Sequence, residues 1–563
     1  MGPTTAGGVR LDERNAAGFS ATVQAIGTLC SLPADRSRIS LPGKPKRPIV
    51  PSIILAIRRI PDYRISVRNL KERAVRGAFA KLCGQAVNFA LRLGFTIVLA
   101  RFLDPADFGL VAMVTAITGL YAMFASAGLS AATIQKEEIT NEQISTLFWV
   151  NILLGMIFGL LSLVTAPILV WFYQEPRLFW LTVAISVGFL IGAAGIQHSA
   201  LLERDLRYFA VTIIGAFSQL LGIAVGVGMA IGGFAYWALV GATTVSTAAG
   251  TACVWLTVAW IPGRPERAVG VRSLLHFGGT ITLNGLIVYV AYNLEKVLLG
   301  RFWGAEALGI YGRAYQLVNM PTENLNSAIG GVAFAALSRL QNEPARLKNY
   351  FLSGYSLVAS MTIPLTLFGA IFAEDTILVI LGPKWNAAAT IFRLLTPTIL
   401  IFGIINPIYW LLISIGLQVR SLKVAMVIAP LVMTAYIIGL PYGPNGVALA
   451  YSAAMTLWLI PHVVWCLHNT GVSPWDLVRA ISRPLTSGIL AASCVLSFEH
   501  YLDQLPSAIL RLAIGGAVMF SLYLCILLFV FGQKTFYRDL LRDLLRRLPE
   551  GAEPAAGWTE GPV

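Results

Sequence analysis

A polar stripe occurs where five polar residues recur at intervals of 4, 3, 4 and 4: Lys81, Gln85, Asn88, Arg92 and Thr96. On an α-helix, which turns by about 100° per residue, these positions fall within about 80° of one another. Amides alone would suit hydrogen bonding between neighbouring helices. Two cations on one face repel each other and prefer water or an anion, so we favour the lining of a polar cavity over a contact between helices.

A second polar face is expected around residue 290, with Tyr289, Tyr292, Asn293 and Lys296 at positions i, i+3, i+4 and i+7. Glu295 falls on another side of the same helix. It could pair with an arginine or act as a titrating coupling group, and we favour the ion pair. Lys296 is near the outer end of its apolar stretch, so its side chain could instead extend to the membrane surface.

Further polar residues, among them Asn319, Arg313 and Arg393, also lie inside long apolar stretches. A charge at mid-bilayer costs at least ~2.5–3.5 kcal/mol, so each is expected to face a cavity or a partner. Guanidinium groups bind phosphate oxygens in pairs, so these cations predict a phosphate-bearing, lipid-linked substrate. The candidate substrate-binding residues are Lys81, Gln85, Asn88, Arg92, Asn293, Glu295, Lys296, Arg313, Asn319 and Arg393. No catalytic residue, metal ligand or cofactor is predicted.

The composition requires a membrane around these residues. Of 563 residues, 56% are hydrophobic and only 12% are charged, roughly half the charge of an ordinary soluble domain. A soluble enzyme is therefore excluded. Lys and Arg number 42 against 28 Asp and Glu, an excess that we assign to membrane topology rather than to a nucleic-acid partner. The six cysteines form no CxxC pair, so neither a disulfide framework nor a metal site is implied.

Apolar stretches of ~20 residues, the length that crosses a bilayer, predict an all-α, polytopic membrane protein with about fourteen spans. The expected spans are 79–100, 109–131, 146–172, 178–202, 209–231, 234–260, 274–298, 309–333, 350–373, 387–414, 421–440, 444–468, 480–499 and 507–532. They divide into one six-helix bundle over 79–260, another over 274–468, and two additional helices over 480–532. The loops between them are too short to hold a soluble catalytic module.

The distribution of basic residues predicts the orientation. The six loops after even-numbered spans carry thirteen Lys and Arg residues, and the seven loops after odd-numbered spans carry four. Because basic loops stay in the cytoplasm, both termini are expected there, in the bacterial cytoplasmic membrane. Residues 1–78 form a basic leader, interpreted as a disordered cytoplasmic extension or as a segment that lies on the anionic inner leaflet. Residues 533–563 form a cytoplasmic tail.

An internal repeat relates the two predicted bundles. Shifted by 200 residues, Ile97-Val-Leu-Ala-Arg-Phe-Leu-Asp-Pro-Ala-Asp-Phe-Gly109 aligns without a gap with Val297-Leu-Leu-Gly-Arg-Phe-Trp-Gly-Ala-Glu-Ala-Leu-Gly309. The aligned segments follow the first and seventh spans, an even offset, so both copies point the same way across the membrane. Parallel repeats of this kind build transporters that open a cavity to alternate sides. Chance similarity of two apolar junctions is the alternative.

The chain also resembles a known family through a series of short motifs. They include Leu103-Asp-Pro-Ala-Asp-Phe-Gly-Leu110, Gly128-Leu-Ser-Ala-Ala-Thr-Ile-Gln135, Arg313-Ala-Tyr-Gln-Leu317, Gly382-Pro-Lys-Trp385 and Gly443-Pro-Asn-Gly-Val-Ala-Leu-Ala450. Over residues 70–530 the order and spacing of these motifs resemble the polysaccharide-transporter branch of the multidrug/oligosaccharidyl-lipid/polysaccharide exporter superfamily. The likeness is greatest to colanic-acid-exporter-like lipopolysaccharide biosynthesis proteins. Where that family has Asp near the end of the seventh span, this chain has Glu295.

The resemblance implies a function as well as a fold. It implies two six-helix bundles with two extra helices, alternating access, and the flipping of polyprenyl-diphosphate-linked oligosaccharides for exopolysaccharide, capsule or lipopolysaccharide synthesis. The expected partners are the lipid-linked oligosaccharide, membrane lipids and other polysaccharide assembly proteins. One alternative is a cation-coupled exporter of small molecules or drugs on the same fold. A membrane-bound polysaccharide polymerase or ligase is a further alternative, which the absence of an assembled acid–base site disfavours.

Overall fold

The computed structural model describes residues 70–126, 130, 133–134, 139–265, 286, 288–535 and 537–538. Throughout this part of the chain the regular secondary structure is helical and no strand occurs, so the predicted all-α class is confirmed. Among the described residues, ten apolar helical segments are long enough to cross a membrane, and one of them, Gln418–Leu467, contains two consecutive helices. The chain is therefore a multi-pass membrane protein.

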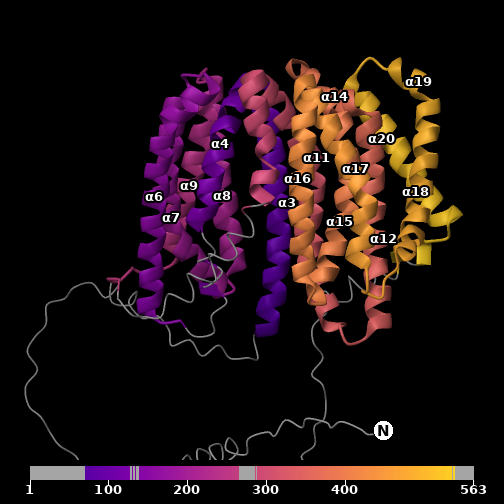
Figure 1. Cartoon of the computed structure of the whole chain (residues 1–563), viewed down its shortest axis with the longest axis horizontal. Helices are drawn as coiled ribbons and strands as arrows, with labels where there is room; N and C mark the ends of the chain where they lie inside the picture. Colours follow the sequence, from indigo (N-terminus) through magenta and orange to yellow (C-terminus); the bar gives the residue numbers. More distant parts are fainter. Residues whose placement is uncertain are drawn as a thin grey trace, which may run out of the picture. The chain divides into compact units, whose positions relative to one another are not determined.

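The first helices pack among themselves and are named here the N-terminal group (Figure 1). Helix α3 packs against α8, α8 against α9, and α7 against both α6 and α9. The bounds are α3 Leu70–Phe102, α4 Pro105–Ser126, α6 Asn141–Tyr173, α7 Leu178–Arg204, α8 Tyr208–Ile231 and α9 Trp237–Thr257. Helix α6 begins at a capping box, in which Thr140 Oγ1 accepts from the Gln143 amide and Gln143 Oε1 accepts from the Thr140 amide.

The helices from α11 to α17 form the C-terminal group. The last helices, α18 to α20, pack against this group mainly where α18 contacts α12. The bounds of the C-terminal group are α11 Leu294–Arg339, α12 Pro344–Ile371, α13 Ala373–Ile380, η3 Pro383–Trp385, α14 Ala387–Leu395, α15 Pro397–Ser414, α16 Gln418–Gly439, η4 Leu440–Tyr442 and α17 Gly443–Leu467. The last elements are α18 Pro474–Ser497, α19 Glu499–Asp503, α20 Ala508–Cys525 and the π-helical turn η5 Ile526–Val530.

The observed helices follow the expected spans closely, with three informative differences. The predicted span 274–298 lies mostly outside the described residues. The predicted span 387–414 is divided into α14 and α15 at Thr396, because Pro397 has no backbone N–H to continue the ladder. Thr396 keeps helical angles of φ −53 and ψ −36, so the two pieces continue in one direction. The 46 residues of α11 contain a kink at Gly304, whose φ of 82 and ψ of −178 are not helical.

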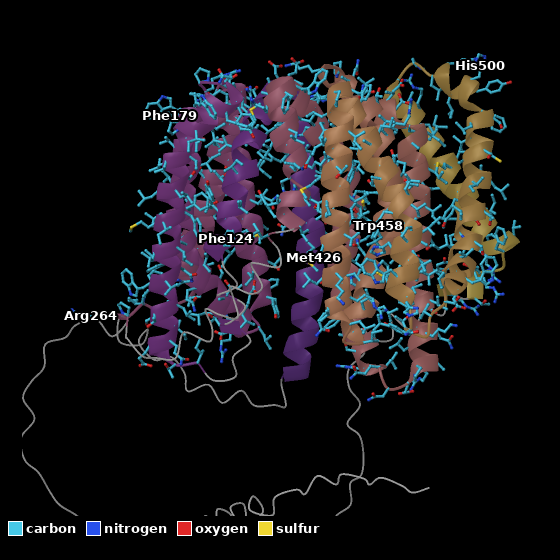
Figure 2. The ribbon with its side chains drawn as sticks, in the orientation of Figure 1. Phe124, Phe179, Arg264, Met426, Trp458 and His500 are labelled. Atoms are coloured by element: carbon cyan, nitrogen blue, oxygen red, sulfur yellow. The ribbon has the colours of Figure 1, made fainter. Side chains whose placement is uncertain are left out.

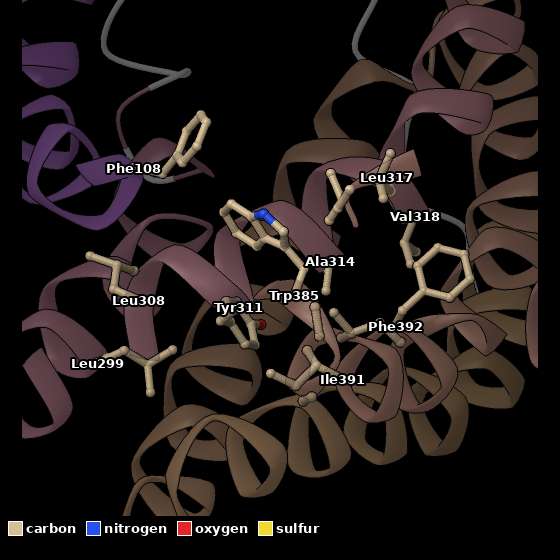
Figure 3. Packing of buried hydrophobic residues seen from close by; sticks show 14 of the residues in the cluster. Phe108, Leu299, Leu308, Tyr311, Ala314, Leu317, Val318, Trp385, Ile391 and Phe392 are labelled. Carbon is tan, nitrogen blue, oxygen red and sulfur yellow. The ribbon is translucent and has the colours of Figure 1, made fainter. Parts of the chain in front are cut away.

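Buried side chains from both groups form one hydrophobic cluster, part of which appears in Figure 3. Trp385 of η3 has no exposed surface and lies beside Phe108 of α4, at 5.3 Å between ring centroids. Leu308 and Tyr311 of α11, 0% and 1% exposed, belong to the same cluster. We call this region the junction end, because α3 ends and α4 begins there. Packing at the junction end joins the two groups.

The repeated glycines are the points of closest approach between α4 and α11. A methyl group on Gly109 would lie 1.7 Å from the carbonyl oxygen of Ala305, and one on Gly309 would lie 1.8 Å from that of Pro105. The two contacted residues, Ala305 and Pro105, are themselves equivalent after the shift of 200, so the two contacts are the same contact made in both directions. This exchange of partners is what a two-fold axis between parallel copies requires, and it supports the internal repeat.

Candidate functional site

Two arginines from different helix groups form the centre of the candidate site. Arg92 of α3 is exposed, Arg313 of α11 is half-buried, and the two lie close enough for their charges to repel each other. Neither forms an ion pair with any acid among the described residues. Two neighbouring guanidinium groups without a carboxylate form a favourable site for an anion, because an anion would neutralise both.

The Arg313 side chain is positioned by its neighbours. Its guanidinium carbon lies 4.1 Å from the centroid of the Phe108 ring, and Nη1 donates to Gln316 Oε1. Phe108 in turn packs edge-on against Trp385, whose Nε1 donates to the Ala100 carbonyl at 3.0 Å. A continuous series of contacts therefore connects the cation pair with the junction end.

The polar stripe on α3 remains a prediction, and two of its side chains have buried oxygens. Gln85 and Asn88 are half-buried, and the side-chain oxygen of each is buried without a hydrogen-bond partner among the described residues. Buried amide oxygens of this kind normally have partners, so these two remain available to a ligand or to water. Lys81 lies on the same helix, and its side chain is outside the described part of the chain.

Glu295 occupies a different place from the cation pair. It is 1% exposed, and within the described residues it has no ion pair and no hydrogen bond from another side chain. Its carboxylate lies among the tyrosines of the C-terminal group, Tyr311 of α11 and Tyr436 of α16, whose buried hydroxyls have no hydrogen-bond partner among the described residues either. The expected ion pair with an arginine is therefore wrong for the residues described, because the acid faces the interior of its own group.

The remaining residues of the second and third polar faces make local contacts. Lys296 Nζ donates to Asn293 Oδ1 at 2.6 Å, and Asn293 Nδ2 donates to the Tyr289 carbonyl at 2.8 Å. These bonds connect the first turn of α11 to the turn before it. Asn319 is half-buried beside Tyr315, three residues after Gln316 and six after Arg313. Asn319 thus lies nearer to the cation pair along α11 than Asn293 and Lys296 do.

Arg393 is separate from the other candidates. Its Nη2 lies 3.3 Å from Glu374 Oε1, and its Nε donates to the Ala370 carbonyl at 3.2 Å. These groups line a cavity between α13, α14 and the last helices. The expectation that Arg393 shares one group with Arg92 and Arg313 does not hold here, because α14 turns the side chain toward α12 and α13. Glu374 and Asp375 occupy the first turn of α13, as expected of acids at a helix start.

The junction end is closed by polar contacts between the groups. Arg101 Nη2 donates to the Val379 carbonyl at 2.7 Å, next to the end of α13. Lys384 Nζ lies 2.8 Å from Asp104 Oδ1. Both pairs connect the end of α3 with α13 and η3. From the sequence, Arg101 and Lys384 lie in predicted loops and Trp385 belongs to a family motif. No sequence signal indicated that the end of α3 contacts residues about 280 positions later in the chain.

Comparisons with known proteins agree with this architecture. Residues 98–390 match the model of a family described as polysaccharide biosynthesis protein. The teichuronic acid biosynthesis protein TuaB of Bacillus subtilis is 28% identical over 436 residues, 72% of this chain and 85% of TuaB. The lipopolysaccharide biosynthesis protein WzxC of Escherichia coli is 26% identical over 352 residues, 62% and 71% of the two chains. The succinoglycan biosynthesis transport protein ExoT of Rhizobium meliloti is 24% identical, with 83% and 94% covered.

Solved structures of similar fold include two kinds of transporter. The lipid II flippase MurJ, in an inward closed conformation, superposes with a TM-score of 0.66 at 14% identity and covers 83% of this chain and all of MurJ. An inward-facing multidrug resistance transporter of the MATE family superposes with a TM-score of 0.53 at 15% identity, covering 70% and 98% of the two chains. At these identities the likeness shows the fold alone.

Proposed function

The chain belongs to the family of polysaccharide biosynthesis proteins, and on that premise we propose that it flips a polyprenyl-diphosphate-linked oligosaccharide across the cytoplasmic membrane. The relatives TuaB, WzxC and ExoT are named for the biosynthesis or transport of surface polysaccharides. MurJ, which shares the fold, is named as a lipid II flippase. The expected product is a precursor unit for exopolysaccharide, capsule or lipopolysaccharide.

The observation that carries this proposal is the pair of unpaired cations, Arg92 and Arg313. They belong to different helix groups, and neither has an acid partner among the residues described. A diphosphate has the oxygens and charge to bind both guanidinium groups at once. Binding would therefore draw the two helix groups together around the head group, as alternating access requires.

The orientation follows from the same proposal. The junction end, where the groups are held together by Arg101, Lys384 and Trp385, is the periplasmic end. Both termini then lie in the cytoplasm, in agreement with the distribution of basic loops. The substrate enters from the cytoplasmic leaflet and leaves when the junction end opens. No bond is made or broken in this cycle, so the protein acts as a transporter rather than an enzyme.

The main competitor is a cation-coupled exporter of small molecules or drugs. The MATE transporter shares the fold, but a cationic drug would be repelled by Arg92 and Arg313, which have no ion-pair partner among the described residues. Glu295, a buried acid of α11, lies inside the C-terminal group among tyrosines. The charges at the candidate site thus favour an anionic substrate.

Leaflet translocation in proteoliposomes tests the proposal. A fluorescent polyprenyl-diphosphate oligosaccharide would be supplied to wild type, Arg92→Ala, Arg313→Ala and the control Arg346→Ala, which removes an exposed ion pair with Glu343. We expect flipping by wild type and control and a loss of at least tenfold in Arg92→Ala and Arg313→Ala. Wild-type flipping that survives both substitutions would retain the function and reject the anion site. Folded wild type that flips none of this lipid but exports small cations would reject the function.

A further inference from the structure

A cavity lies at the junction end, and neither Arg92 nor Arg313 lines it. Its volume is about 620 Å³, within the range of roughly 300–1,000 Å³ that is usual for ligand sites. It is bounded by the start of α13, the exposed side of α14 and the last helices α18 to α20. Figure 1 shows α14 and α19 at the same end of the helices, and Figure 2 shows His500 of α19 there.

One wall of this outer cavity is held in place by an ion pair. Arg511 of α20 binds Asp375 of α13 through three contacts, Nη2 to Oδ1 at 2.6 Å and Nε to Oδ1 and Oδ2 at 3.0 and 3.2 Å. Arg511 Nη1 also donates to the Leu505 carbonyl at 3.1 Å. Because these bonds fix α20 against α13, the wall is already formed in the absence of a ligand.

The opposite wall presents polar groups with capacity to spare. Asn386, Thr390 and Arg393 follow one another at i, i+4 and i+7, and all three are exposed on the cavity face of α14. No side-chain hydrogen bond of Asn386 or Thr390 is found in the described part of the chain. Arg393 and Glu374 make one bond at 3.3 Å, with 50% and 77% of their side chains exposed, so little of their hydrogen-bonding capacity is used.

The chemistry of the outer cavity differs from that of the cation pair. Two arginines are balanced by two carboxylates, Glu374 and Asp375, so the cavity has no net charge to attract a diphosphate. It offers an amide, a hydroxyl, a carboxylate and a guanidinium, which together both donate and accept. Phe372, Leu378 and Val495 also line the cavity; Phe372 and Val495 are buried, so the half-buried Leu378 contributes most of their apolar surface. A sugar ring matches these groups, because its hydroxyls donate and accept hydrogen bonds and its C–H face is apolar.

We propose that the outer cavity binds sugar residues of the transported oligosaccharide. This inference rests on the proposed function, which places a glycan at the periplasmic end after translocation, and it divides the substrate between two sites. The cation pair holds the diphosphate, and the outer cavity holds sugars. Leu378, whose carbonyl lies 3.4 Å from Arg101 Nη2, lines the outer cavity as well, so the glycan would bind next to a contact that closes the junction end.

Binding of the glycan alone tests this proposal. The probe is the free oligosaccharide that mild acid releases from the host's own lipid-linked intermediate, which removes both the lipid and the diphosphate. Titration calorimetry would measure its binding to the full-length protein in nanodiscs. The test variant is Asn386→Leu with Thr390→Val, and the matched control is Asn349→Leu with Ser353→Ala. The control pair has the same spacing on α12, near the helix end opposite the outer cavity.

We expect saturable binding by wild type, by the control and by Arg92→Ala, and at least tenfold weaker binding by the Asn386–Thr390 variant with an unchanged melting temperature. Two results would reject sugar binding in the outer cavity while leaving the proposed function intact. One is equal affinity in the test and control variants. The other is no binding by folded wild type that flips the lipid-linked substrate. Glycerophosphoethanolamine that binds in place of the oligosaccharide would overturn it in favour of a lipid head group. Oligosaccharide binding without any flipping would retain the outer cavity and reject the flippase.

Discussion

The two copies of the repeat share their backbone approach and differ in their side-chain contacts. Gly109 and Gly309 contact each other's copy in the same way. In contrast, Arg101 of the first copy donates to a carbonyl of α13, whereas Arg301 lies over the Phe172 ring of α6 at 5.7 Å. Duplication therefore preserved the crossing of the helices, because backbone sterics leave no freedom there, while the contacts that close the junction end became specific to one copy.

The chemical groups are more unequal still. When the ungapped shift of 200 is continued, Glu295 corresponds to Phe95, and Arg92 corresponds to Tyr292. Arg313 likewise corresponds to Met113, which packs in the hydrophobic cluster. The cation pair thus takes one member from each copy at positions that are not equivalent. The symmetry therefore organises the helix crossing, whereas single, non-equivalent positions supply the charged groups.

The largest effect is expected from the glycine crossing. Gly109→Ala and Gly309→Ala each place a methyl group less than 2 Å from a backbone oxygen. Such overpacking costs about 3 kcal/mol, which lowers the population of the closed junction end more than a hundredfold. Flipping and disulfide cross-linking between Asp104→Cys and Lys384→Cys would report the loss. Gly312→Ala, with no heavy atom within 4 Å, is the control. Clearly unequal effects of the two glycines would contradict a symmetric crossing of α4 and α11.

Glu295→Gln is expected to have a smaller effect, and one that does not destabilise the fold. A buried carboxylate without a side-chain partner costs about 1–3 kcal/mol or more, and the neutral amide avoids part of that cost. The variant should therefore melt at the same or a higher temperature, measured by thermal unfolding in detergent. Its flipping should fall, because a buried unpaired acid within a membrane is kept for function. Glu306→Gln, an exposed acid on the same helix, should change neither. A clear loss of stability in Glu295→Gln would show that the acid has a structural partner.

The two arginines of the repeat should respond unequally. Arg101→Met removes a charged hydrogen bond between the groups, worth about 1.5 kcal/mol. Arg301→Met removes an exposed cation–π contact worth about 0.5 kcal/mol. Cross-linking at the junction end should decrease several times more in the first variant than in the second. Equal decreases would mean that the copies close the junction end symmetrically after all.

The smallest effect concerns the ion pair between Asp104 and Lys384. Their side chains are 68% and 49% exposed, so the pair contributes roughly 0.5 kcal/mol and is screened by salt. Lys384→Glu should open the junction end slightly at low ionic strength, and the double variant with Asp104→Lys should restore it. The difference should disappear near 1 M salt, where the Debye length is about 3 Å. An effect that persists at that ionic strength would require a contact other than this pair.

Hydropathy and residue spacing are enough to identify the membrane class, the positions of the helices and the internal repeat. A bilayer needs ~20 apolar residues per crossing, so hydropathy alone located spans such as 178–202, observed as α7 at Leu178–Arg204. The helical period also determined that Gln85, Asn88 and Arg92 share a face, since periodicity depends on one helix only.

Which helix faces contact one another depends on the packing of the whole bundle. Arg92 and Arg313 come together, Glu295 points into its own group, and Arg393 lines a separate outer cavity. A helical wheel specifies the direction of a side chain around its own axis but not the neighbour that lies there. That neighbour depends on the rotation and crossing of helices, which are decided by close packing between distant segments such as Gly109 and Ala305. The partners of each charge therefore belong to the assembled bundle.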